Sequence, residues 1–146
     1  MRVVAGEAGG RRLIAPEGSD TRPTLDRVRE AMFNSLVSLG AVDGAKVLDL
    51  YAGSGALGIE ALSRGALSCV FVDTGRDARK AIATNLVTTG FVDQSIVAPQ
   101  DAVTWLRQVS TSAGLEHSRF DLVLIDPPYA AEDDLWSEVL SFVGIV

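Results

Sequence analysis

The chain has 146 residues, 47% of them hydrophobic and 22% charged, and a formal net charge of −6 at pH 7. This length and composition predict one globular domain with a single core and exclude a disordered or fibrous chain. The apolar runs are far shorter than the roughly 20 residues that cross a bilayer, so no contact with a membrane is expected.

The N-terminal segment carries most of the positive charge. Residues 1–29 hold six arginines and four carboxylates, a net charge of +2, whereas the remaining residues carry −8. An acidic chain argues against a large nucleic-acid footprint, so any contact with a polyanion is expected at this segment. The alternative is that these arginines are solvated surface. The segment lacks the apolar region of a secretory signal, and Cys69 has no partner for an intramolecular disulfide, so a cytoplasmic protein is expected.

Two short runs near the N-terminus have the composition of β-strands. Residues 2–4 and 12–14 are separated by the glycine-rich AGEAGG, which predicts an N-terminal hairpin. After a loop over residues 16–23, apolar side chains recur at helical spacing from Leu25. We therefore expect an amphipathic helix that ends near Gly40.

Strands and helices alternate from Lys46 onward. The expected strands are residues 46–50, 69–73, 95–98 and 121–126, and the expected helices between them are 56–64, 77–88 and 102–109. This βαβ series predicts an α/β fold with a mostly parallel, doubly wound sheet that helices cover on both faces. A further helix is expected over 135–142, and residues 144–146 resemble the start of another strand.

The stretch VLDLYAGSGALG, residues 47–58, is typical of a cradle for a nucleotide-type cofactor. An apolar strand leads into a glycine-rich turn that opens into a helix. Gly53 and Gly55 lack the Cβ atoms that would keep a ligand away from the backbone, and they tolerate the tight turn. Because GSGALG also fits the dinucleotide fingerprint, an NAD-dependent oxidoreductase remains an alternative function at this point.

Carboxylates stand at or just beyond the ends of the expected strands. Ligands of parallel sheets bind beyond these ends, so the carboxylates form one candidate rim. Asp73 lies 20 residues after Gly53, where a carboxylate accepts hydrogen bonds from ribose hydroxyls. Asp101, followed by Ala102, is placed to accept one from an adenine amino group, although a helix N-cap is an equally good interpretation. The four carboxylates are Asp49, Asp73, Asp101 and Asp126.

The tetrapeptide DPPY, residues 126–129, favours methyl transfer over hydride transfer. The lone pair of an exocyclic amine or amide nitrogen is delocalised, so an enzyme that methylates it must help to localise that pair. A carboxylate and a backbone carbonyl, held by two prolines with fixed φ, can accept hydrogen bonds from both N–H groups of the amine. Tyr129 can stack on the base, a contact worth ~1–3 kcal/mol. The alternative is a proline-rich turn after a strand.

These motifs in combination resemble one family. The chain also contains RPT at 22–24, DRVRE at 26–30 and EALSRGA at 60–66. Over nearly its whole length it is similar to the RsmD family of bacterial 16S rRNA (guanine-966-N2)-methyltransferases. The resemblance implies a Rossmann-like class I methyltransferase fold with a seven-stranded sheet. It also implies S-adenosylmethionine as cofactor, S-adenosylhomocysteine as its product, and no metal.

The resemblance also implies roles for parts of the chain. Residues 1–40 would form an RNA-facing extension, and residues 41–146 the methyltransferase domain. The residues expected to bind the cofactor are Asp49, Tyr51, Gly53, Ser54, Gly55, Asp73, Asp101 and Ala102. Those expected to face the guanine are Asp126, Pro127, Pro128 and Tyr129. Those expected to contact RNA are Arg11, Arg12, Arg22, Thr24 and Arg27.

We therefore expect a monomeric enzyme that methylates 16S rRNA by direct in-line displacement, within a small ribosomal subunit or its assembly intermediate. The family continues through a final strand pair, whereas this sequence ends at Val146, so the natural protein is expected to extend further. Methylation of an adenine N6 or of a protein glutamine is the alternative within the same chemistry. An NAD-dependent oxidoreductase and a cofactor-binding module without activity are alternatives from other classes.

Overall fold

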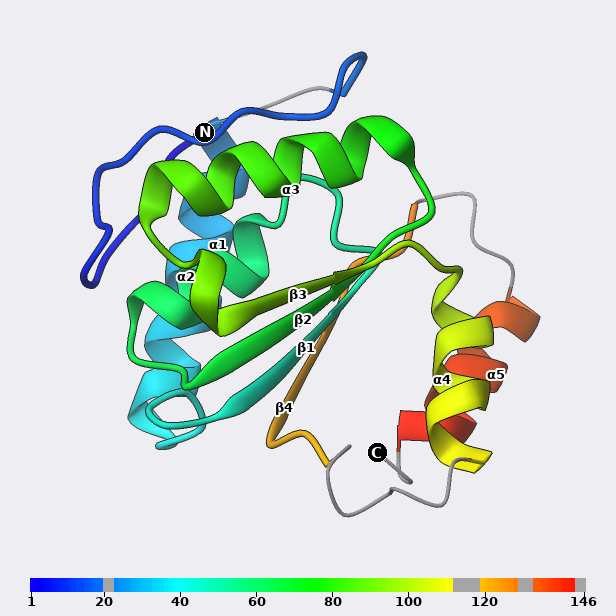
Figure 1. The fold of residues 1–146 in the computed structure, drawn as a ribbon. Helices are drawn as coiled ribbons and strands as arrows, with labels where there is room; N and C mark the ends of the chain where they lie inside the picture. Colours follow the sequence, from blue (N-terminus) through cyan, green and yellow to red (C-terminus); the bar gives the residue numbers. More distant parts are fainter. Residues whose placement is uncertain (20–22, 112–118, 129–132, 144–146) are drawn as a thin grey trace.

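The computed structural model describes residues 1–19, 23–111, 119–128 and 133–143, and Figure 1 shows a sheet between two groups of helices. The strands are β1 (Lys46–Leu50), β2 (Ser68–Val72), β3 (Ser95–Ala98) and β4 (Leu122–Ile125). They pair in parallel in the order β3-β2-β1-β4. The predicted α/β class is therefore confirmed.

Helices cover both faces of the sheet, as expected for a doubly wound fold (Figure 1). One face carries α1 (Pro23–Ser38), α2 (Ala56–Ser63) and α3 (Arg76–Thr89), and the other carries α4 (Ala102–Thr111) and α5 (Asp133–Val143). A short 3-10 helix, η1 (Val92–Gln94), precedes β3. Apart from the N-terminal hairpin, each expected helix and strand within the described residues is present, and its ends lie within about two residues of the expected ones, the usual uncertainty of helix and strand boundaries.

The sheet separates two clusters of buried side chains. Because side chains alternate along a strand, Val47 packs with Phe33 on the face of α1, α2 and α3. Leu48 packs with Leu106 on the face of α4 and α5. By the same alternation Asp49 is directed to the first face, beneath α2. Burying one such large apolar side chain contributes roughly 1.5–3 kcal/mol to stability.

The N-terminal residues pack on the first face but form little β-structure. The expected hairpin is reduced to a single antiparallel bridge between Arg2 and Arg12. Val3, Ala8 and Leu13 are buried in the same cluster as α1, α2 and α3. The N-terminal segment is thus held by side chains inserted into the core rather than by a ladder of backbone hydrogen bonds.

Two expectations concern parts of the chain that the structure does not reach. Four strands lie within the described residues, against the seven that the resemblance implies, and residues 144–146 lie outside them. The division of function at residue 40 stays a prediction. Across the described ranges, no helix is long and apolar enough to cross a membrane.

Candidate cofactor and substrate site

The order of the strands defines where a ligand should bind. The chain runs from β1 outward to β2 and β3, and then returns to place β4 on the other side of β1. The loops after β1 and β4 therefore diverge to opposite faces, and the crevice between them is the ligand site of open α/β sheets. A cleft of about 750 Å³ lies there. It is lined by residues 51–54 after β1, by Asp73 and Thr74 after β2, by Asp126 and Pro128 after β4, and by Leu25, Val28 and Met32 of α1.

The glycine-rich turn forms one wall of this cleft. Gly53 and Gly55 have φ of 57° and 78°, in the left-handed region that favours glycine. A Cβ at Gly53 would meet nothing within 4 Å, so its backbone is open to a ligand. A Cβ at Gly58 would come within 2.4 Å of the Phe71 ring. Gly58 thus allows α2 to pack closely on β2, which is the role of the third glycine in such turns.

Asp73 connects the turn to the end of β2. Its carboxylate accepts hydrogen bonds from the backbone N–H of Gly53 at 2.9 Å and of Gly75 at 2.8 Å. An ionised carboxylate has about four lone-pair sites. Two remain for a ligand in the cleft, so Asp73 can fix the turn and bind ribose hydroxyls at the same time.

Asp49 does not line the cleft. It is only 1% exposed, and its Oδ2 accepts a hydrogen bond from the Gly58 N–H at 2.9 Å. Its Oδ1 is buried without a hydrogen-bond partner among the described residues. Burial raises the pKa of Asp49 from 3.8 to about 8, the Gly58 N–H opposes the rise, and the charges of Asp126 and Asp73 add to it. Asp49 therefore supports the turn from below rather than touching a ligand in the cleft.

The raised pKa of Asp49 predicts a pH-dependent stability. An acid whose pKa is higher in the folded chain binds more protons when folded, so stability falls as the pH rises from about 4 to about 8. The stability of Asp49→Asn relative to wild type in urea unfolding should therefore grow from pH 5 to pH 8, because the amide never ionises. Asp93→Asn, at an exposed position, is the control. An equal loss of stability between the two pH values in Asp49→Asn and wild type would contradict this role.

Tyr51 lies at the end of β1 with φ of 57°, the one described non-glycine residue with a left-handed φ. It lines the cleft, while its hydroxyl is buried without a hydrogen-bond partner among the described residues. Burial raises the pKa of this hydroxyl, and the charges of Asp101 and Glu138 raise it further. A bulky residue held in this conformation is strained, and such strain often marks a ligand site.

In the structure Asp101 is a helix N-cap, which was one of the two roles expected for it. Its Oδ2 accepts hydrogen bonds from the backbone N–H of Thr104 at 3.1 Å and from the Thr104 hydroxyl at 3.3 Å, which makes it the N-cap of α4. Neither Asp101 nor the buried Ala102 lines the cleft. Their contact with an adenine ring stays a prediction.

Asp126 and Pro128 lie on the side of the cleft opposite the turn. The Asp126 N–H donates to the carbonyl of Leu50 at 3.4 Å, which continues the pairing of β4 with β1. Its exposed side chain accepts no hydrogen bond from the described residues. Pro127 is half-buried. Tyr129 lies outside the described residues.

The arginines expected to contact RNA have different surroundings. The Arg11 guanidinium donates to the carbonyl of Thr88 at 2.5 Å, near the C-terminus of α3. Arg12 and Arg27 are exposed. Arg22 and the side chain of Thr24 lie outside the described part of the chain.

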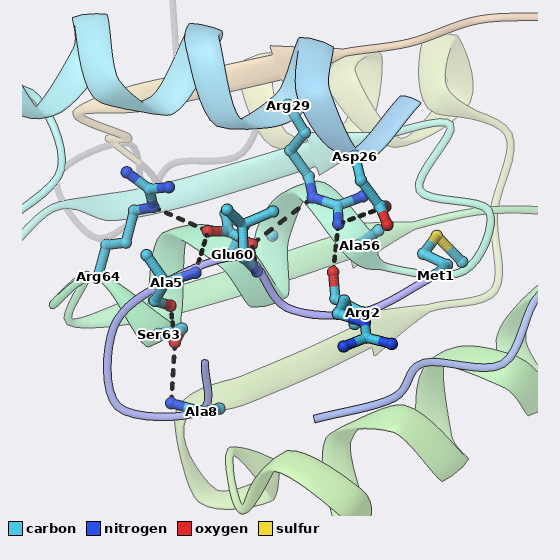
Figure 2. A network of polar contacts seen from close by, with 12 residues as sticks. Met1, Arg2, Ala5, Ala8, Asp26, Arg29, Ala56, Glu60, Ser63 and Arg64 are labelled. Atoms are coloured by element: carbon cyan, nitrogen blue, oxygen red, sulfur yellow. Dashed lines mark hydrogen bonds and ion pairs between the residues drawn. The ribbon is translucent and has the colours of Figure 1, made fainter. Parts of the chain in front are cut away.

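A buried polar network that the sequence pattern did not predict holds the N-terminal segment on α2 (Figure 2). Glu60 is 0% exposed, and its carboxylate accepts hydrogen bonds from the backbone N–H of Val4 at 2.9 Å and of Ala5 at 3.1 Å. The same carboxylate pairs with Arg64 at 2.8 Å and with Arg29 at 3.5 Å. Arg29 also lines the cleft, so the network connects the N-terminal segment to the site.

Asn85 is a second residue whose polar contacts the sequence pattern did not predict. Its side-chain amide donates to the carbonyls of Ile14 and Ser54, both at 2.9 Å, and its oxygen accepts from the Ile14 N–H at 2.8 Å. It therefore joins the N-terminal segment to the glycine-rich turn. A polar side chain on the otherwise apolar face of α3 was the available signal, because buried polar groups need hydrogen-bond partners.

Comparison with known proteins matches the chain to one family model and to proteins named as rRNA methyltransferases. A family model described as "Conserved hypothetical protein 95" matches residues 1–144. "Putative rRNA methyltransferase YlbH" of Bacillus subtilis is 42% identical over 129 residues, which cover 88% of this chain and 67% of that protein. "Ribosomal RNA small subunit methyltransferase D" of Escherichia coli K12 is 36% identical, covering 88% and 60%.

A solved structure is also similar. The structure titled "Putative methyltransferase yhhF from Escherichia coli" matches with a TM-score of 0.79 and 31% identity, and the match covers 99% of this chain and 71% of that one. Of the two curated relatives named above, the chain spans 67% of the Bacillus subtilis protein and 60% of the Escherichia coli protein.

Proposed function

The chain belongs to the RsmD family, whose model is described as conserved hypothetical protein 95, and on that premise we propose that it methylates rRNA. Its fold is that of the Rossmann-like methyltransferases. The proposed reaction transfers a methyl group from S-adenosylmethionine to the exocyclic N2 amine of a guanine in 16S rRNA. The names of the relatives support an rRNA substrate. The guanine and its N2 atom come from the chemistry of the DPPY tetrapeptide and from the family resemblance.

One observation carries the proposal: a single cleft joins the two halves of the site. Asp73 and the glycine-rich turn stand on one side, and Asp126 and Pro128 stand on the other. Transfer between two bound molecules needs their reacting atoms side by side, which a shared cleft at the switch point provides.

The charges that line the cleft suit the proposed cofactor. Asp73 and Asp126 contribute negative charge, while the positive charge of Arg29 is paired with Asp26 at 3.0 Å and with Glu60 at 3.5 Å. S-adenosylmethionine carries a positively charged sulfonium, which supplies the methyl group, whereas NAD carries a pyrophosphate. Unlike charges attract and like charges repel in a partly buried cleft. The lining therefore favours the sulfonium compound over a dinucleotide.

The chain's own groups then have separate tasks. Asp73 and the open backbone of Gly53 would bind the cofactor, as described above. Asp126 and the carbonyl of Pro127 would each accept a hydrogen bond from one N–H group of the amine and so direct its lone pair into the cleft. The methylated nitrogen is strongly acidic, so Asp126 or water can take its proton. The base must leave its stack to enter the cleft, as for other base-modifying enzymes.

The role of Asp73 predicts a graded loss of cofactor affinity. Asp73→Ala should weaken binding of S-adenosylmethionine by ~1–3 kcal/mol, because buried hydrogen bonds to the ribose are lost. Asp73→Asn, which keeps one accepting oxygen, should lose less. Asp77→Ala, an exposed carboxylate in the first turn of α3, is the control and should bind as wild type does. Isothermal titration calorimetry measures all four proteins, and binding of NAD tighter than of S-adenosylmethionine would refute the assignment.

The proposed activity is tested with S-adenosylmethionine labelled on the methyl group. The protein is incubated with small ribosomal subunits, with naked 16S rRNA and with total protein from cells that lack this enzyme. We expect label in RNA. Label in protein would favour glutamine methylation, and no transfer to any of the three, despite cofactor binding, would favour a binding module.

A further inference from the structure

The single bridge of the N-terminal segment places two arginines directly opposite each other. The Val3 N–H donates to the carbonyl of Arg11, and the Leu13 N–H donates to that of Met1, both at 2.9 Å. These bonds flank the Arg2–Arg12 pair and make it a non-hydrogen-bonded pair, the kind in which facing side chains lie closest, with Cα atoms about 4.5 Å apart. The two side chains therefore leave the same side of the bridge as close neighbours.

Like charges in such a position are unfavourable unless something compensates for them. Both arginines are exposed, and neither guanidinium has a hydrogen bond or an ion pair with the described residues. Arg11 differs, because its guanidinium already bonds the carbonyl of Thr88. Arg2 and Arg12 thus present at one point two guanidinium groups that have no partner among the described residues, and an anion between them would turn repulsion into attraction.

The backbone of this pair is held in place beside the cleft. The Arg29 guanidinium donates to the carbonyl of Arg2, as Figure 2 shows, and Arg29 itself lines the cleft. Met1 also lines the cleft, and its Cα lies about 3.8 Å from that of Arg2. Glu60 fixes the next residues through the Val4 and Ala5 N–H groups. The backbone that carries the pair therefore lies next to residues that line the cleft.

We propose that Arg2 and Arg12 form a clamp for one backbone phosphate of the RNA substrate. The inference rests on the proposed function, because it takes RNA as the substrate. Guanidinium groups bind phosphate oxygens through paired, charge-assisted hydrogen bonds. Phosphate contacts fix the register of a nucleic acid without reading its sequence, so the clamp would position the target base rather than select it.

Salt dependence of binding tests the clamp. The dissociation constant for naked 16S rRNA is measured by filter binding between low and physiological salt. Because each neutralised phosphate contributes roughly 0.7–0.9 to the log–log slope, the double variant Arg2→Ala/Arg12→Ala should lower the slope by about that much. Two independent contacts would lower it by about twice as much, and this result or an unchanged slope would overturn the clamp. Arg119→Ala, an exposed arginine just before β4, is the matched control and should keep the wild-type slope.

A second variant separates binding from folding. Arg2→Glu places a carboxylate opposite Arg12, so it should be at least as stable as wild type in urea while binding 16S rRNA more weakly than Arg2→Ala does. Wild-type affinity in Arg2→Glu, or a loss of its stability, would contradict the proposed pairing. Failure of the proposed function has a different signature. If wild type transfers no methyl to RNA, yet the double variant still lowers the salt slope by one phosphate contact, the activity is refuted and the clamp is kept.

Discussion

Replacing Asp126 with alanine is expected to lower methyl transfer by about 10²–10³-fold, the loss that follows removal of one group that orients or stabilises the reacting atoms. The affinity for S-adenosylmethionine should stay close to that of wild type. Asp126 follows β4, on the other side of β1 from Asp73, and its side chain accepts no hydrogen bond from the described residues. Its removal should therefore cost the proposed contact to the incoming amine and no side-chain hydrogen bond to the described residues.

The comparison with asparagine sharpens this prediction. Asp126→Asn keeps an accepting oxygen but loses the charge, so its transfer rate should fall between those of wild type and Asp126→Ala. Asp93→Ala changes an exposed carboxylate of η1, before β3 at the opposite end of the sheet, and should transfer at the wild-type rate. Single-turnover transfer and calorimetry together separate chemistry from binding. Most of the activity retained in Asp126→Ala would mean that the carboxylate does not orient the amine.

Glu60→Ala should lower the free energy of unfolding by about 3–5 kcal/mol, the cost of removing one partner from a buried ion pair. Glu60 is fully buried, and its loss would remove one acceptor from the guanidinium groups of Arg29 and Arg64 and the acceptor of two backbone N–H groups. The network already contains two buried donors without a hydrogen-bond partner among the described residues: Arg29 Nε, which has only the 3.5 Å ion pair with Glu60, and one terminal nitrogen of Arg64. It therefore has little spare capacity to absorb the loss.

This change should also loosen the N-terminal segment on α2, where Ser63 still holds Ala5 and Ala8. Glu60→Gln keeps one accepting oxygen and should cost less stability than Glu60→Ala. Glu30→Ala, at an exposed position of α1, is the control and should be within about 0.5 kcal/mol of wild type. Urea unfolding measures stability, and limited proteolysis after the arginines of residues 1–14 measures release of the segment. Wild-type stability in Glu60→Ala would show that the network does not hold this segment.

The sheet and its helices could be predicted because their signals are local. Apolar runs defined the strands, helical spacing defined the helices, and the glycine-rich turn indicated the first crossover. Gly58 illustrates the limit of that reasoning. Its place in the fingerprint was visible, but the reason for it, close packing against Phe71, depends on a strand that lies further along the chain.

The polar part of the site was harder to predict because its partners are distant in sequence. Glu60 binds residues 55 and 56 positions before it, and Asn85 binds Ile14 across 71 positions. No spacing rule connects such pairs. Asp49 and Asp101 were correctly placed near strand ends, but alternation along β1 buries Asp49 beneath the turn, and Asp101 caps α4. The hairpin was reduced to one bridge because core side chains, Glu60 and Ser63 hold the segment instead.

The central claim is that this site methylates the N2 amine of a guanine in rRNA, and the most direct measurement identifies the labelled nucleoside. 16S rRNA methylated in vitro by this protein with labelled S-adenosylmethionine is digested to nucleosides, which are separated by chromatography and identified by mass. We predict that the label is in N2-methylguanosine and that Asp126→Ala removes it. Label in N6-methyladenosine, or RNA that stays unlabelled while a protein glutamine is methylated, would contradict the account.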